Sequence, residues 1–222
     1  MAERILIGQG EICERVLLNE CDTDLHIVQQ QESVLRLYVF GLTEESDMEN
    51  HIVIEQEGKG CTTELYGLLL ASANRSVVVN THILHSQGGG NSEQLFKYIL
   101  SDRSKGYFEG RLKIAPDAQQ TSAAQTNRNL LLSPTAKMRT LPQLEIYADD
   151  VKASHGASTG QLDENALFYM RQRGLSGEQA RLLLVSAFAE EVIEKVRNVT
   201  LKQQIVQMVE QRLSKMIQAE LT

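Results

Sequence analysis

Leu35-Arg36-Leu37-Tyr38-Val39 is the clearest alternating stretch of the chain, with an apolar side chain at every second position. Successive side chains of a strand point to opposite faces, so this pattern predicts a half-buried β-strand. Short apolar runs of the same kind recur at intervals of roughly 10 to 25 residues. The predicted strands cover residues 15–18, 25–29, 34–40, 51–55, 64–70, 76–84, 107–114 and 143–147.

The connections between these strands narrow the fold class. None is long and periodic enough for the crossover helices of a doubly wound sheet. The strands therefore belong to a sandwich, a barrel or a coiled parallel β-helix, and their spacing does not choose among the three. The glycine-rich turn at residues 86–92 favours a solenoid, because loops on one side of a solenoid vary freely in length.

The pattern changes to helices after Gly160. Asp163 is placed to cap a helix over residues 164–173, and Gly174 to end it. Ser176 and Gln179 form a capping box before a second helix.

A last helix is predicted over residues 201–219, with an apolar stripe that packs on the preceding helix or docks on a partner protein. We therefore expect two domains, a β core at residues 1–160 and a helical domain at residues 161–222.

Composition excludes several classes of protein. The 222 residues carry a net charge of -7, and no cluster of Lys or Arg is placed to bind phosphate backbones. No apolar run approaches the 18 or more residues that span a bilayer, and the N-terminus lacks the apolar region of a signal peptide. Cys13, Cys21 and Cys61 form no CxxC pair and are interpreted as core or surface residues. We expect a cytoplasmic protein that does not bind nucleic acid.

Two motifs match patterns found in enzymes, but the surrounding sequence argues against a catalytic role for either. Residues 156–160 match the G-x-S-x-G nucleophile elbow around Ser158, but that fold needs a histidine after the serine, and all five histidines precede it. His82 and His85 form an H-x-x-H pair, yet they lie on a predicted strand and point to opposite faces. The chain also lacks a phosphate-binding P-loop. We predict that it hydrolyses neither esters nor ATP.

An ordered set of blocks carries a family resemblance. The chain resembles the SufB/SufD family of iron-sulfur cluster assembly scaffold proteins, and within it SufD most closely, over roughly residues 106–196. The blocks lie at residues 111–115, 126–132, 142–152, 154–157, 166–175 and 187–189. The resemblance implies a mainly β fold, a right-handed parallel β-helix followed by a small C-terminal α-helical domain.

The resemblance also implies partners. Proteins of this family pair through their β-helices with a SufB-like paralogue and bind a SufC-type ATPase through the C-terminal helices. They act as scaffolds and not as enzymes, with no cofactor held stably by the chain alone and a transient iron-sulfur cluster in the complex. Two alternatives stay open: a SufB-like or self-pairing scaffold that carries the cluster alone, and a β-helix hydrolase.

His155 is the candidate ligand for iron or for the cluster, at the partner interface. It occupies the family's S-H-G position, whereas Ala153 stands where SufD sequences often have a cysteine. A neutral imidazole binds iron well and replaces thiolate at some clusters. Asp149 or Asp150 is expected to orient the imidazole if the backbone turns after Val151.

The candidate partner-binding residues are Phe168, Tyr169, Arg171 and Arg173. Phe168 and Tyr169 are adjacent and so about 100° apart on a helix, which lets one face the core while the other contributes to an interface. Arginine is enriched at such surfaces. We expect the ATPase to contact this block.

Overall fold

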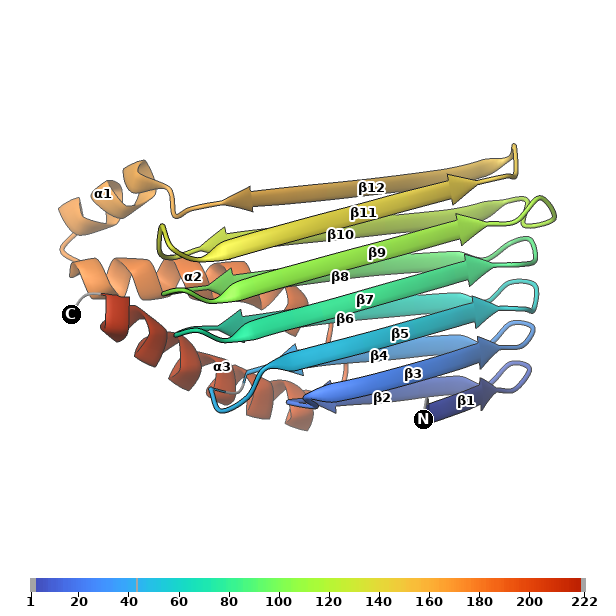
Figure 1. The fold of residues 1–222 in the computed structure, drawn as a ribbon, viewed down its shortest axis with the longest axis horizontal. Helices are drawn as coiled ribbons and strands as arrows, with labels where there is room; N and C mark the ends of the chain where they lie inside the picture. The colour runs from blue at the N-terminus through green and yellow to red at the C-terminus, as the bar shows by residue number, and fades with distance from the viewer. Residues whose placement is uncertain (1–2, 43, 221–222) are drawn as a thin grey trace.

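The computed structural model describes residues 3–42 and 44–220, in which twelve strands precede three helices (Figure 1). Sheet A contains the odd-numbered strands: β1 (Glu3–Ile7), β3 (Asp22–Gln29), β5 (Met48–Gln56), β7 (Ser76–His85), β9 (Lys105–Ile114) and β11 (Lys137–Ile146). Sheet B contains the even-numbered strands: β2 (Ile12–Leu18), β4 (Val34–Gly41), β6 (Thr62–Ala71), β8 (Asn91–Leu100), β10 (Thr121–Leu131) and β12 (Val151–Gly160).

Consecutive strands lie in opposite sheets, and each strand pairs in parallel with the strand two places along the chain. Each pair of strands is therefore one turn of a solenoid. This arrangement is the parallel β-helix implied by the resemblance, and it selects one of the three folds that strand spacing left open.

Alternation in β4 divides the solenoid interior from its outer face. Leu35, Leu37 and Val39 belong to an apolar cluster between the two sheets. Tyr38 and Phe40 point the other way and belong to a second cluster, between sheet B and the helices. Both faces of sheet B are therefore buried where the helices cover it, which explains why the pattern fades toward continuous apolar residues in this strand.

Stacked turns connect the strands. Glu32, Gly60, Gly89 and Gln120 all adopt positive φ, between 57° and 72°. The N–H of Gly60 donates to the carbonyl of Gly88 at 3.1 Å, and the N–H of Gly89 donates to the carbonyl of Gln119 at 2.8 Å. The turns thus continue the hydrogen-bond ladder of the sheets from one layer to the next.

Helices α1 and α2 begin where the sequence predicted, and α3 begins two residues earlier than predicted. In α1 (Glu164–Gln172), the Asp163 side chain accepts from the N–H of Asn165 at 2.8 Å. In α2 (Gly177–Ile193), Ser176 and Gln179 form the capping box. The apolar stripe of α3 (Val199–Glu220) packs with α2 on the outer face of sheet B. Figure 1 shows both helices behind the strands, on this side alone.

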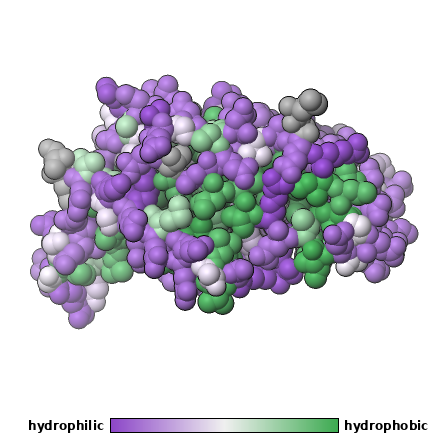
Figure 2. All heavy atoms as spheres, turned by 90° about the horizontal axis from the view of Figure 1, so that it is seen from below, coloured by the Kyte–Doolittle hydropathy of each residue, from purple (hydrophilic) through white to green (hydrophobic). Residues whose placement is uncertain are grey.

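The strand-to-helix change falls between Gly160 and Glu164. Because α2 and α3 share one apolar cluster with sheet B, the division into two domains stays a prediction. At the N-terminal end of the solenoid, in β1 and β2, Leu6 and Ile12 are exposed apolar residues. Figure 2 views the molecule from below, where β1, β2 and α3 lie in Figure 1, and hydrophobic residues gather in the middle of this face.

Candidate functional site

Strand β12 ends sheet B and leaves one of its edges open. It pairs with β10 over ten residues, from Thr121↔Val151 to Leu130↔Gly160, and no other strand of the described chain pairs with it. Its residues from Ser154 onward are exposed. A parallel edge of this length presents a row of unpaired N–H and C=O groups, which is a template for another strand.

His155 lies on the inner row of this last turn. It is the register neighbour of Gln125, which in turn neighbours Gln94. Gln125 is buried and donates from Nε2 to the carbonyl of Gly110 at 3.0 Å. Register neighbours in parallel strands share a face, so His155 continues an interior column of polar side chains. It is exposed, because no further turn of the described chain covers it.

The condition for a contact between His155 and a neighbouring carboxylate, a turn after Val151, is not met. The backbone does not turn after Val151 but runs extended through His155 as β12. Among the described residues, no hydrogen bond or ion pair joins His155 to Asp149 or Asp150. Within the same part of the chain, no three His, Cys, Asp or Glu side chains are grouped to hold a metal ion. His155 can therefore supply one ligand to a site that other groups must complete.

The structure places Ser158 inside β12 instead of on a strand-to-helix elbow. Gly156 and Gly160 are likewise strand residues, and neither has a positive φ. Three positions along a strand separate Ser158 from His155, so the two side chains point to opposite faces. The geometry thus provides no serine–histidine pair on this strand.

The H-x-x-H pair is split across β7, as the sequence predicted. His82 lies on the outer face, and burial lowers its pKa. His85 points inward and is fully buried, and burial lowers its pKa to about 4. The three cysteines are free, and Cys61 is buried with Sγ 3.0 Å from the carbonyl of Gln30.

Helix α1 presents the predicted partner-binding residues to solvent. Phe168 is 64% exposed and Tyr169 is 59% exposed, so the expectation that one of the two faces the core is wrong. Leu167 is the buried residue of this helix. Arg173 donates to the Tyr169 hydroxyl at 2.8 Å and lies 5.1 Å from the centre of its ring, which orders that side chain. Arg171 is exposed on the same helix.

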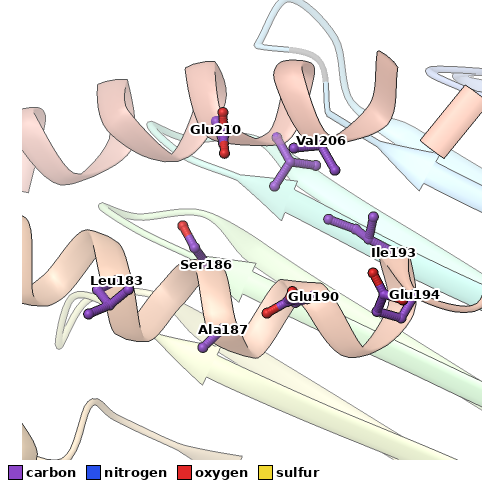
Figure 3. Close-up of a pocket in the computed structure, with 9 residues that line it drawn as sticks. Leu183, Ser186, Ala187, Glu190, Ile193, Glu194, Val206 and Glu210 are labelled. Carbon is purple, nitrogen blue, oxygen red and sulfur yellow. The ribbon is translucent and has the colours of Figure 1, made fainter. Parts of the chain in front are cut away.

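The structure also contains a groove between α2 and α3, which the sequence did not predict. Two adjoining hollows, of about 210 Å³ and about 460 Å³, share lining residues from both helices. Figure 3 shows side chains of both helices around the first hollow. The apolar residues lining the groove are Leu175, Leu182, Leu183, Ala187, Ile193, Val206 and Val209, and the acidic ones are Glu190, Glu194 and Glu210. Its floor is therefore apolar and its charged groups are all negative.

Buried polar contacts fasten α2 to sheet B. Lys97 of β8 is almost fully buried, donates to the carbonyl of Phe188 at 2.8 Å and forms an ion pair with Glu191. Its ammonium group lies 4.3 Å from the centre of the Phe188 ring. Beyond the helix end, Lys195 pairs with Glu93 at 2.7 Å. These contacts fix the groove relative to the strands.

None of the helices in the described part of the chain is long and apolar enough to cross a membrane. The apolar faces of α2 and α3 are directed against the solenoid and against each other.

Comparison with known proteins identifies the family of the chain. The model of the family described as "SUF system FeS cluster assembly, SufBD core domain" matches residues 23–188. The chain is 40% identical over 156 residues to the iron-sulfur cluster assembly protein SufD of Escherichia coli (strain K12), a match over 70% of this chain and 37% of that protein.

Two further relatives agree. A SufBD family protein of Synechocystis is 35% identical over 170 residues, covering 77% of this chain and 37% of the relative. Protein ABCI7, chloroplastic, of Arabidopsis thaliana is 38% identical over 156 residues, covering 70% of this chain and 33% of the relative. The match thus spans only about a third of each relative's length. With a family model that matches most of its length, the chain belongs to the SufBD core domain family of the SUF iron-sulfur cluster assembly system.

Proposed function

We propose that the chain is a SufD-type scaffold subunit for iron-sulfur cluster assembly. It pairs with a SufB-like partner at the β12 edge, and its helices hold a SufC-type ATPase. The observation that carries the proposal is the open edge of β12 with His155 on its inner row, in a chain of this family.

The β12 edge supports pairing with a strand of a related β-helix. Ten residues of strand offer main-chain hydrogen bonds along the whole edge. The inner row of the last turn also contains Leu144 and Ile146, and Ile146 is 43% exposed. A partner strand would continue the solenoid and cover these side chains. Pairing with a second copy is the alternative, and it places His155 of each copy near the shared edge.

His155 supplies chemistry suited to a cluster that is built and then released. Its neutral imidazole binds iron of intermediate softness and exchanges more readily than a thiolate. The described chain brings no cysteine, histidine or carboxylate into a ligand group with it. The partner therefore completes the site, and the cluster is the cargo of the complex.

The helical region supports docking of the ATPase. The exposed aromatic pair on α1 belongs to no buried cluster, and the groove between α2 and α3 is open at Leu183, which is 51% exposed. Aromatic side chains and desolvated apolar surface dominate protein interfaces. ATP hydrolysis belongs to this partner, since the chain has no P-loop.

A His155→Ala variant tests the site in a complex assembled from the full chain and its SufB-type and SufC-type partners. We expect co-purification of all subunits to be unchanged, because His155 is exposed, and the iron content and visible absorbance of the complex to be lost. Ser154→Ala is the matched control, since Ser154 is the neighbouring exposed residue and points to the other face. Normal cluster content in His155→Ala would refute the assignment.

A further inference from the structure

The outer face of sheet A is uncovered in the described chain. Helices α2 and α3 pack on sheet B, and Figure 1 shows the strands of sheet A in front with no helix across them. Strand alternation gives this face a full set of outward side chains from β3, β5, β7, β9 and β11.

Charge on this face is divided along the solenoid axis. The outward positions of β3 and β5 contain four carboxylates and no Lys or Arg: Asp22, Asp24, Glu49 and Glu55. Arg4 of the edge strand β1 also points outward, beyond β3. The outward positions of β9 and β11 contain five cations, Lys105, Arg111, Lys113, Lys137 and Arg139, and two carboxylates, Glu109 and Glu145. Strand β7, between them, contributes none of either sign. The basic half is notable in a chain with a net charge of -7.

Contacts within the chain leave much of this charge unmatched. Lys105 and Lys137 are register neighbours, and like charges side by side on one face are destabilising. Among the described residues, neither ammonium group lies within 4.0 Å of a carboxylate, and the same holds for Lys113. Lys113 instead lies 5.8 Å from the centre of the Tyr147 ring. An oppositely charged surface would remove this repulsion.

We propose that this face binds the same face of a second copy of the chain. A two-fold axis parallel to the strands and centred on β7 sets β5 against β9 and β3 against β11. Such a rotation keeps each residue's position along the strand, so the pairs follow from the register. Asp22 opposes Arg139, because both lie in the row of Val78.

A second pair forms at the other end of the strands. Glu55 opposes Lys113, because both lie in the row of Leu84. In the middle, His51 opposes Glu109. No row sets two groups of like charge against each other across the axis. The pattern of one face is therefore complementary to itself, as a two-fold interface requires.

The area of the outer face of sheet A limits the affinity of the proposed dimer. Five strands about 4.8 Å apart and about 28 Å long cover about 650 Å² on each copy, or about 1,300 Å² in total. That area lies at the low end of specific interfaces, and charged groups facing each other make the contact depend on salt. The dimer is consequently weak and dissociates at high ionic strength.

Sedimentation velocity on the full chain tests the proposal. We expect a dimer at low salt and a monomer at high salt. Lys113→Glu and Glu55→Lys should each weaken dimerisation at least tenfold, since each sets like charges against each other. The double variant restores opposite charges and should return to within about threefold of the original dissociation constant. Lys59→Glu, on an exposed turn outside the face, should leave the dimer unchanged.

Two results would overturn the proposal. If the chain stays monomeric at all concentrations in low salt, the outer face of sheet A does not bind a second copy. A dimer that survives both single reversals would have to form elsewhere, for example at the β12 edge.

Discussion

His85 Nε2 and Ser92 Oγ lie 2.9 Å apart in the interior of the β-helix, and both side chains are buried. Among the described residues, the other ring nitrogen of His85 has no hydrogen-bond partner. A charged imidazole has little to compensate its lost hydration there, and burial lowers the pKa of His85 to about 4.

Stability should therefore fall in acid through His85. Its pKa is about 6.5 in the unfolded chain and about 4 in the folded one, so the unfolded state binds more protons between these values. The free energy of unfolding should lose about 3 kcal/mol from about pH 7.5 to pH 4, and the loss is steepest between the two pKa values. Urea unfolding over this range measures it, and His85→Gln should have a shallower slope. Equal slopes for the two proteins would contradict the prediction.

Gly67 makes room for the Phe96 ring. A Cβ at this position would lie 2.2 Å from Cδ1 and Cε1 of that ring, inside the apolar cluster between the sheets. Gly67→Ala should lower the free energy of unfolding by about 2 kcal/mol, the cost of overpacking a closely packed core. Gly156→Ala is the matched control, since nothing lies within 4 Å of its Cβ position in an exposed strand. Equal stability of both variants in urea would show that the ring moves aside freely.

Lys97 should stabilise the attachment of α2 through its charge and its length together. Lys97→Ala removes the contacts with Phe188 and Glu191 and leaves a cavity, so we expect a loss of about 3 kcal/mol in thermal or urea unfolding. Lys97→Met keeps the volume and should cost less than half as much. Equal losses in Lys97→Met and Lys97→Ala would indicate that the ion pair, which both variants lack, dominates over packing.

Polar side chains inside the solenoid explain why some strands were not predicted from the sequence. Strand β10 points Gln125, Asn127 and Asn129 inward, and β8 points Ser92 and Gln94 inward. These groups hydrogen-bond within the interior, as when Gln94 Nε2 donates to Thr81 Oγ1 at 2.6 Å. Three successive inward positions of β10 are polar, and in β8 two polar positions precede the inward Phe96, Tyr98 and Leu100. The apolar alternation is therefore interrupted in both strands, and neither was predicted. The missing β1 and β12 lie at the two ends, where fewer neighbours require apolar residues.

The candidate site was predicted unevenly for a related reason. His155 was found by resemblance, because one exposed histidine carries no periodic signal. Its position on an open inner row follows from pairing with β10, which is a long-range contact. The groove likewise needs both α2 and α3 to be placed side by side. By contrast, the caps of α1 and α2 are local hydrogen bonds, and Asp163 and Ser176 predicted them correctly.

The groove and the exposed face of α1 should contribute separately to binding of a SufC-type ATPase. Leu183 is 51% exposed and lines both hollows of the groove. A charge in its place would have to be desolvated on docking, so Leu183→Arg should weaken binding of the ATPase at least tenfold. The double variant Phe168→Ala, Tyr169→Ala removes two aromatic side chains from the proposed interface and should weaken binding by a similar factor. Titration calorimetry with the purified ATPase gives both affinities.

Leu6→Arg is the matched control for Leu183→Arg, because Leu6 is 62% exposed at the opposite end of the solenoid. All variants should unfold at the same temperature as the original chain, since none of the three side chains on α1 and α2 belongs to a buried cluster. Loss of binding only in Leu183→Arg would assign the ATPase to the groove, and loss only in the α1 variant would assign it to Phe168 and Tyr169. Full binding by both would remove the helices from the proposed interface.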